Sequence, residues 1–136
     1  MGMRIRVSRS VLIGIQRISA DAHPREACGL LFGGADAITD WQAVENVAEE
    51  PERRFEIAPG ALFAALRAER AGGPEIVGYW HSHPSGDATP SITEAAMAQP
   101  DGKLWLIVAR EDATLWRAED PAPLHGRFRR VELSLG

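Results

Sequence analysis

The sequence is poor in cysteine and has no long hydrophobic run. A single cysteine, Cys28, among 136 residues excludes an internal disulfide and a zinc site built on four cysteines. This cysteine usage suits a reducing compartment, so we expect a cytoplasmic protein. Arg, Glu or Gly interrupts every apolar run before it reaches the ~20 residues that a membrane span needs. The basic N-terminus also lacks the apolar stretch of a signal peptide, so neither a membrane segment nor a leader is expected.

Positive charge is scarce as well. The chain has 15 Lys+Arg against 19 Asp+Glu, a formal charge of -4, which does not favour nucleic acid as the main partner. Arginines gather near both ends of the chain, and we interpret them as solvated faces of a strand and a helix rather than as one basic patch. With 45% hydrophobic and 25% charged residues the composition is typical of a soluble globular protein. The length predicts one domain, residues 1–136.

Hydrophobic spacing predicts a mixture of strands and helices. Strands are expected at 3–7, 28–34, 37–47, 76–80, 104–109, 113–118 and 127–135. Helices are expected from Ser8 or Ser10 to before Pro24, from Pro59 to before Gly72, and from Ser91 to about Ala98. In the second helix, Leu62, Phe63 and Leu66 are expected to face inward. This order predicts an α/β (α+β) fold, a mixed central sheet flanked by helices.

The stretch from His81 to Glu94 carries most of the chemical information. His81 and His83 follow a predicted strand, and because strand side chains alternate, both imidazoles point to the same face. From there they can converge on one ion with Zn–N bonds of ~2.0 Å. Glu94, in the first turn of the next helix, is placed to supply a third ligand. Two histidines, one carboxylate and a water make an open, catalytic type of zinc site, and the same spacing also suits iron or manganese.

These residues also have ordinary interpretations. An isolated His-x-His pair is more often a surface pair than a metal site. Ser91 and Glu94 fit a capping box, in which the serine hydroxyl accepts a hydrogen bond from the backbone of Glu94 and the glutamate reaches back. Ser91 can serve in the cap and at the site, whereas we expect that Glu94 cannot easily be both a cap and a ligand. His23 and His125 have no partner at a suitable spacing and are interpreted as ordinary residues.

Three motifs follow one another along the chain: Glu26 within Pro24-Arg-Glu-Ala-Cys-Gly-Leu-Leu-Phe-Gly, then Gly78-Tyr-Trp-His-Ser-His-Pro, then Pro90-Ser-Ile-Thr-Glu94. In this order they resemble the JAMM (MPN+) family of zinc metalloproteases in its compact bacterial form. The family signature is an upstream glutamate, His-x-His-Pro, and Ser-x-x-Asp with ten residues between the second histidine and the acid; here residues 84–93 supply that spacing. The resemblance extends from about residue 4 to 110, including Asn46 and Arg54-Phe55. It implies a cytidine-deaminase-like architecture and one catalytic Zn²⁺.

The resemblance implies a role for each matching residue. The two histidines would be imidazole ligands, and Glu94 stands where the family has its aspartate ligand. Glu26 would take a proton from the attacking water as general base and carry it to the leaving amine. Ser91 would help to hold the oxyanion. Because this chemistry needs no covalent intermediate, we interpret Cys28 as a buried thiol rather than a nucleophile.

Glu94 departs from the family pattern by one methylene. Glutamate is an accepted zinc ligand, so we expect the helix to lie slightly further back and Glu94 to bind normally. The alternatives are that Asp87 or Asp101 substitutes for it, or that the metal binds weakly.

The predicted function is that of a zinc hydrolase cleaving a peptide or isopeptide bond, with the C-terminal tail of a ubiquitin-like or sulfur-carrier protein as substrate, because similar bacterial family members act there. The tail is expected to bind extended beside the strand ending at His81. The alternatives are a non-catalytic MPN-type interaction module and a RadC-like protein linked to DNA repair, whose loop matches His83–Asp87. No membrane partner is expected, and the sequence allows a homodimer.

Overall fold

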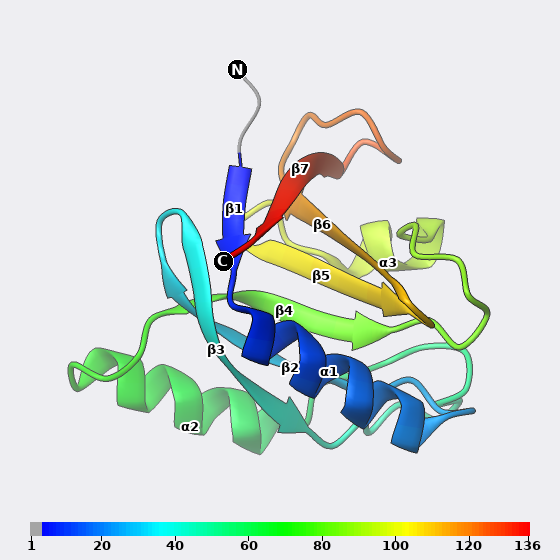
Figure 1. Cartoon of the computed structure of the whole chain (residues 1–136), viewed down its shortest axis with the longest axis horizontal. Helices are drawn as coiled ribbons and strands as arrows, with labels where there is room; N and C mark the ends of the chain where they lie inside the picture. Colours follow the sequence, from blue (N-terminus) through cyan, green and yellow to red (C-terminus); the bar gives the residue numbers. More distant parts are fainter. Residues whose placement is uncertain (1–3) are drawn as a thin grey trace.

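The computed structural model describes residues 4–136, which form seven strands and three helices (Figure 1). The strands are β1 (Arg4–Val7), β2 (Cys28–Gly34), β3 (Ala37–Val44), β4 (Ile76–Ser82), β5 (Leu104–Ala109), β6 (Asp112–Ala118) and β7 (Phe128–Leu135). The helices are α1 (Arg9–Ala22), α2 (Pro59–Arg70) and α3 (Ile92–Met97). The predicted elements are present, although the strand expected at 37–47 ends at Val44. Met3, predicted to begin the first strand, lies outside the described residues.

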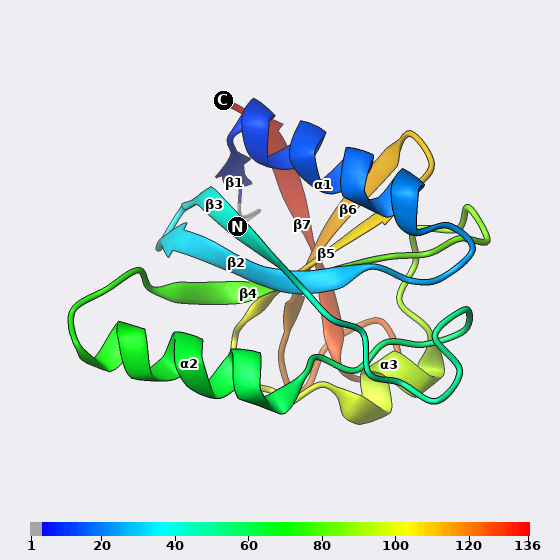
Figure 2. The same ribbon diagram turned by 90° about the horizontal axis from the view of Figure 1, so that it is seen from below.

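The strands form one mixed sheet in the order β1-β3-β2-β4-β5-β6-β7. β4 and β5 are parallel, and β1 is parallel to both β3 and β7, which closes the sheet into a barrel. In Figure 2, α1 lies on one side of the strands, and α2 and α3 lie on the opposite side. The predicted mixed sheet with flanking helices is confirmed. Its closure depends on pairing between the two ends of the chain, which local alternation does not reveal.

The residues of β4 alternate between two cores. Trp80 is fully buried in the core that includes Val11 and Ile15 of α1. Tyr79 and His81 point to the other side of the sheet, where Tyr79 packs against the cluster that includes Trp105. The strand that leads into the His-x-His segment is therefore held from both faces, and His81 lies in an aromatic environment with no exposed surface.

Gly29 allows β2 to lie close to β3 and to Trp80 of β4, next to His81. A Cβ at this position would be 1.9 Å from the carbonyl oxygen of Gln42 and 2.4 Å from the indole nitrogen of Trp80. That indole donates a hydrogen bond of 3.1 Å to the same carbonyl. A side chain at Gly29 would therefore separate β2 from β3 and disturb Trp80 in β4.

The inward face predicted for α2 is wrong in part. Leu62 and Ala65 contact the core beneath the helix, but Phe63 is 64% exposed and Leu66 is 37% exposed. Consecutive helical residues point about 100° apart. A helix that meets the sheet along one narrow stripe, here centred on Leu62 and Ala65, therefore leaves Phe63 in solvent.

The arginine-rich ends of the chain meet because β1 pairs with β7. Acidic residues accompany them: Arg4 lies 3.1 Å from Glu132, and Arg129 lies 2.7 Å from Glu119. These exposed pairs agree with the interpretation of solvated faces rather than an unpaired basic patch. Within residues 4–136, no helix is both long and apolar enough to cross a bilayer.

Candidate active site

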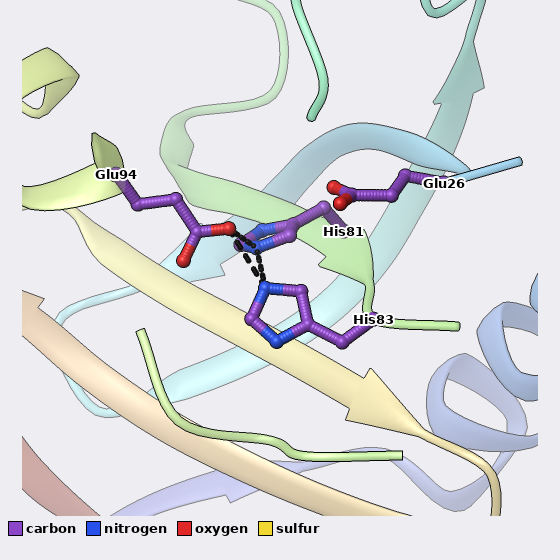
Figure 3. A group of neighbouring side chains, drawn as sticks. All are labelled: Glu26, His81, His83 and Glu94. Carbon is purple, nitrogen blue, oxygen red and sulfur yellow. Dashed lines mark hydrogen bonds and ion pairs between the residues drawn. The ribbon is translucent and has the colours of Figure 1, made fainter. Parts of the chain in front are cut away.

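Three side chains converge where β4 ends (Figure 3). His81 lies near the end of β4, His83 lies just beyond it, and Glu94 comes from α3. The two Nε2 atoms are 3.0 Å apart, and each lies 2.7 Å from the same oxygen, Oε2, of Glu94. All three side chains are at least nine-tenths buried. Ligand atoms around a tetrahedral ion with bonds of ~2.0 Å lie roughly 3.3 Å apart, so a small outward adjustment would seat zinc among them.

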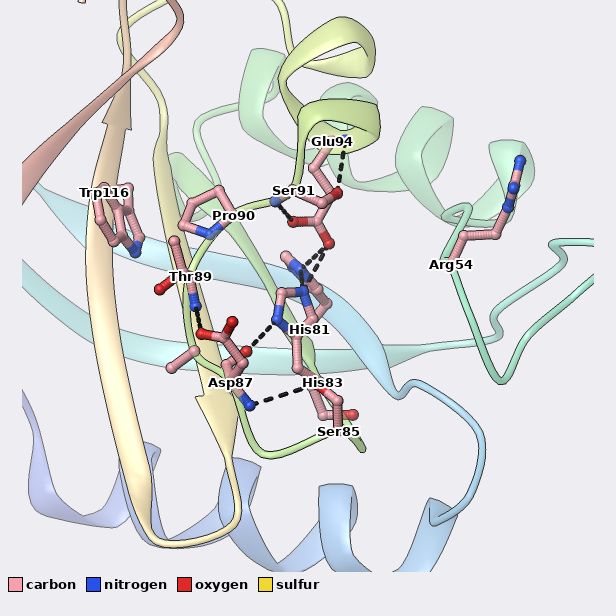
Figure 4. Close-up of polar contacts among 12 residues, drawn as sticks. Arg54, His81, His83, Ser85, Asp87, Thr89, Pro90, Ser91, Glu94 and Trp116 are labelled. Atoms are coloured by element: carbon pink, nitrogen blue, oxygen red, sulfur yellow. Dashed lines mark hydrogen bonds and ion pairs between the residues drawn. The ribbon is translucent and has the colours of Figure 1, made fainter. Parts of the chain in front are cut away.

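The hydrogen bonding of His83 is suited to a cation. Its Nδ1 lies 2.6 Å from the carbonyl oxygen of Asp87 (Figure 4). A carbonyl only accepts, so Nδ1 carries the proton and Nε2 of the neutral ring presents a lone pair. That lone pair faces the carboxylate of Glu94, and two acceptors at 2.7 Å require a positive species near them. Either a second proton on the imidazole or a metal ion satisfies this requirement.

The titration behaviour of the group agrees with this charge pattern. Burial lowers the pKa of His81, favouring its neutral form, which is the form that binds metals. Burial also opposes protonation of His83. The hydrogen bond to Glu94 and the negative charge of the Glu94 carboxylate outweigh burial and raise the pKa of His83. Burial would raise the pKa of Glu94, yet its hydrogen bonds to the two histidines hold it well below the usual range. Glu94 is therefore a carboxylate, the form in which a glutamate side chain can bind a metal.

Glu94 forms the cap of α3 and also contacts both imidazoles. Its Oε1 accepts a hydrogen bond of 2.8 Å from the backbone N–H of Ser91, and its own N–H donates to Ser91 Oγ at 3.0 Å (Figure 4). This is a complete capping box at the start of α3. The other oxygen, Oε2, faces the imidazoles. The two carboxylate oxygens face different partners, so formation of the cap leaves Oε2 directed at the histidines, where the sequence places a third ligand.

Glu26 completes the group from the segment before β2. Cys28 pairs with His81 in the antiparallel ladder, so continuing the register by two residues brings Glu26 opposite His83. One ligand-type atom from each of Glu26, His81, His83 and Glu94 lies within 4.8 Å of the others. Oε1 of Glu26 is buried without a hydrogen-bond partner. Burial raises the pKa of this carboxyl to about 7, close to the value that suits a general base at neutral pH.

The buried Glu26 carboxyl should make the stability of the metal-free protein depend on pH. Its pKa is 4.5 when solvated and about 7 when folded, so the folded state loses stability as pH rises between these values. Glu26→Gln removes this ionisation. At pH 8 we expect the metal-free variant to be more stable than wild type by about 1–2 kcal/mol, and at pH 4 the two should be equal. Urea unfolding at both pH values measures the difference in unfolding free energy between the variant and wild type. If this difference is the same at pH 4 and at pH 8, the prediction is contradicted.

A cavity of about 360 Å³ lies in front of this group, and its walls include Glu26, His83, Ser91 and Glu94. The hydroxyl of Ser91 accepts from Glu94, which leaves its proton available to donate toward the cavity. Cys28 does not line this cavity, and burial raises the pKa of its thiol to about 12. The thiolate that a nucleophile requires is thus disfavoured, as the sequence indicated.

The side chains of the other candidate ligands make contacts outside the converging group, although Asp87 lines the same cavity. The side chain of Asp87 accepts from the backbone of Thr89, and that of Asp101 accepts from the backbone of Lys103. Neither belongs to the group of metal-competent atoms. His125 contacts the carbonyl oxygen of Pro90 and also stays outside it.

The expected docking of a tail beside β4 is wrong. β4 pairs with β2 on one edge and with β5 on the other, through Ser82 in the parallel pair. Strand addition needs a free edge with unpaired N–H and C=O groups, and this strand has none.

Two residues that hold the site had no recognisable chemical signal in the sequence. The ring of Phe55 stacks on His81 with a centroid distance of 4.2 Å and an interplanar angle of 21°. Within residues 4–136 Nδ1 of His81 has no hydrogen-bond partner, so packing against Phe55 adds to the Nε2 contact with Glu94 in orienting this ring. Asn46 bonds the backbone of Glu26. Phe55 and Asn46 could be noticed in the sequence only through the family resemblance. Their contacts with His81 and Glu26 join residues far apart in the chain, and such contacts produce no recognisable sequence motif.

Comparisons with known proteins agree with this geometry. Residues 8–119 match the family of prokaryotic homologs of the JAB domain. The desampylase of Haloferax volcanii is 34% identical over 116 residues, covering 82% of this chain and 84% of that protein. The fold matches a solution structure from Desulfitobacterium hafniense with a TM-score of 0.80 at 22% identity, covering 97% and 92% of the two chains. It also matches a structure described as a metalloprotease-like zinc site in the proteasome and signalosome, with a TM-score of 0.59 at 21% identity, covering 98% and 99%.

Proposed function

This chain belongs to the family of prokaryotic JAB-domain proteins and is a hydrolase of the JAMM type, and from that premise we propose that it is a zinc-dependent isopeptidase. Its proposed substrate is a conjugate formed through the C-terminal tail of a ubiquitin-like or sulfur-carrier protein. The relative named desampylase supports a ubiquitin-like substrate. The observation that carries the proposal is the convergence of two imidazoles and one carboxylate beside the buried Glu26.

The donor set fits zinc. His81, His83 and Glu94 supply two nitrogens and one oxygen, the combination found in open catalytic zinc sites. Nε2 of the neutral His83 ring and Oε2 of Glu94 both present lone pairs to one another, and a metal ion between them would bind both. When bound there, zinc would polarise the scissile carbonyl and lower the pKa of an adjacent water to about 7.

The protein's own residues would move the proton. Glu26 accepts a proton from the attacking water as the water oxygen forms a bond to the carbonyl carbon. The C–N bond then breaks, and Glu26 delivers that proton to the departing nitrogen. The products are a carboxylate on the modifier and a free amine on its former partner. The Ser91 hydroxyl, which lines the same cavity, is placed to donate to the oxyanion that develops on the carbonyl.

Cleavage and metal content together test this function. The probe is a ubiquitin-like protein, or in a parallel series a sulfur-carrier protein, joined through its C-terminal carboxylate to the lysine ε-amine of a fluorescent peptide. Protein purified without chelator should contain about one equivalent of zinc and release the peptide. Removing the metal should abolish release, and one equivalent of zinc should restore it. Less than about a tenth of an equivalent of metal, with no release from either series, would favour the non-catalytic interaction module.

A further inference from the structure

The side chain of Asn46 uses all of its hydrogen-bonding capacity on the backbone around the site. Nδ2 donates to the carbonyl oxygen of Glu26 at 2.9 Å and to that of Arg54 at 3.1 Å. Oδ1 accepts from the N–H groups of Ala48 and Glu56, both at 3.0 Å. An amide has two donor protons and two main acceptor directions, so this one is fully satisfied. A single side chain thereby ties the segment 46–57 to Glu26, two residues before β2 begins.

That segment holds Glu26 from both sides of its backbone. The N–H of Glu26 donates to the carbonyl oxygen of Pro51 at 2.7 Å, and the carbonyl oxygen of Glu26 accepts from Asn46. Within residues 4–136, no hydrogen bond holds Oε1 of Glu26. The position of this carboxylate therefore depends on how well its backbone is fixed.

The same segment also positions a proposed ligand. Phe55 follows Arg54, whose carbonyl oxygen Asn46 binds, and its ring stacks on His81. Nε2 of His81 faces Glu94, whereas Nδ1 has no hydrogen-bond partner among the described residues, so this stacking is a second constraint on the imidazole plane. Figure 4 shows Arg54 on the segment, to one side of the two histidines. Asn46 thus connects the backbone of Glu26 with the residue that packs on His81.

We propose that Asn46 is a positioning residue that sets the place of Glu26 relative to His81 and His83, rather than only closing the turn of its own segment. The proposal rests on the proposed function insofar as Glu26 acts as a base. Misplacing a reacting group by about 1 Å can lower a rate by as much as 10²-fold without weakening substrate binding. Loss of the Nδ2 contacts should therefore lower kcat and leave KM nearly unchanged.

Two substitutions separate the positioning role from a purely structural one. Asn46→Ala removes all four hydrogen bonds, whereas Asn46→Asp keeps an acceptor for Ala48 and Glu56 but loses both donors. If Asn46 only closes the turn, the aspartate variant retains wild-type kcat. If it positions Glu26, the aspartate variant loses about tenfold or more in kcat with KM within about twofold, and its zinc content stays at one equivalent.

Lys103→Met is the matched control. Lys103 Nζ donates to the carbonyl oxygen of Ile76 at 2.8 Å, at the opposite end of β4 from the histidines. This variant also removes a side-chain donor from a backbone carbonyl, and it should lower stability while keeping kcat. A kcat loss in Lys103→Met equal to that in Asn46→Asp would overturn the proposal, as would wild-type kcat in Asn46→Asp.

Amide hydrogen exchange in the metal-free protein gives a readout that is independent of activity. In Asn46→Asp, the N–H of Glu26 should exchange about tenfold faster or more, while amides of β5 keep their protection. Unchanged exchange at Glu26 would contradict the proposal even if the rates fall. If the wild-type protein cleaves no conjugate, the proposed function fails, and the amide exchange of Glu26 alone decides the role of Asn46. If Asn46→Ala does not fold, Asn46→Asp serves for both the kcat and the exchange measurements.

Discussion

Glu26→Gln lowers the rate of conjugate cleavage by about 10²–10⁴-fold while zinc remains bound at one equivalent. Glutamine has nearly the same shape as glutamate but does not accept a proton at neutral pH. Three other side chains supply the proposed ligands, so metal content should not change. The same substitution is expected to stabilise the metal-free protein above pH 7, because the carboxyl with its pKa near 7 is buried without a partner on Oε1. Loss of activity with a gain of stability is the signature of a residue kept for its chemistry.

Glu52→Gln is the control for that experiment. Glu52 lines the same cavity and undergoes the same chemical change, but it is exposed and lies outside the group of converging atoms. The rate of conjugate cleavage by Glu52→Gln should stay within about threefold of the wild-type rate. Rates and zinc content are measured on the same preparations. Activity retained in Glu26→Gln would remove Glu26 as the base, and loss of zinc from that variant would reassign it as a ligand.

Glu94→Asp weakens zinc binding by about 10–100-fold, even though aspartate is the residue that the JAMM signature has at this position. In this chain the carboxylate spans from the Ser91 N–H to the two imidazoles. A side chain shorter by one methylene cannot keep both contacts without moving α3. It either leaves the cap, which frees the carboxylate to rotate, or withdraws from the histidines. Competition with a chromophoric chelator measures the zinc affinity of the variant and of wild type.

Asp87→Asn is the control for zinc affinity. The side chain of Asp87 accepts from the N–H of Thr89, and an asparagine oxygen accepts the same bond. The contact with His83 comes from the backbone carbonyl of Asp87 and is unaffected. Affinity within about threefold of wild type is expected. Wild-type affinity in Glu94→Asp would show that the link to the cap does not hold the ligand, whereas a large loss in Asp87→Asn would make Asp87 the third ligand.

Several features of the site could be predicted from short stretches of sequence. Alternation along a strand places His81 and His83 on one face, and Ser91 with Glu94 marks the first turn of a helix. Predictions from local spacing were wrong where the burial of a residue depends on which other elements pack against it. Helical spacing made Phe63 look like a core residue, yet it is 64% exposed, since α2 meets the sheet along one stripe. The predicted docking beside β4 failed for a similar reason, because a strand does not reveal which of its edges are already paired.

The identity and order of the reactive groups, and the orientation of two histidines toward one face, follow from short stretches of the chain, because side-chain alternation and helix capping act within a few residues. Folding in three dimensions brings Glu26 beside His83, lets Glu94 contact both the cap and the histidines, and packs Phe55 on His81. Each of these depends on the register between β2 and β4 or on the segment tied by Asn46. Those contacts join residues far apart in the chain, and their geometry exists only once the sheet has formed.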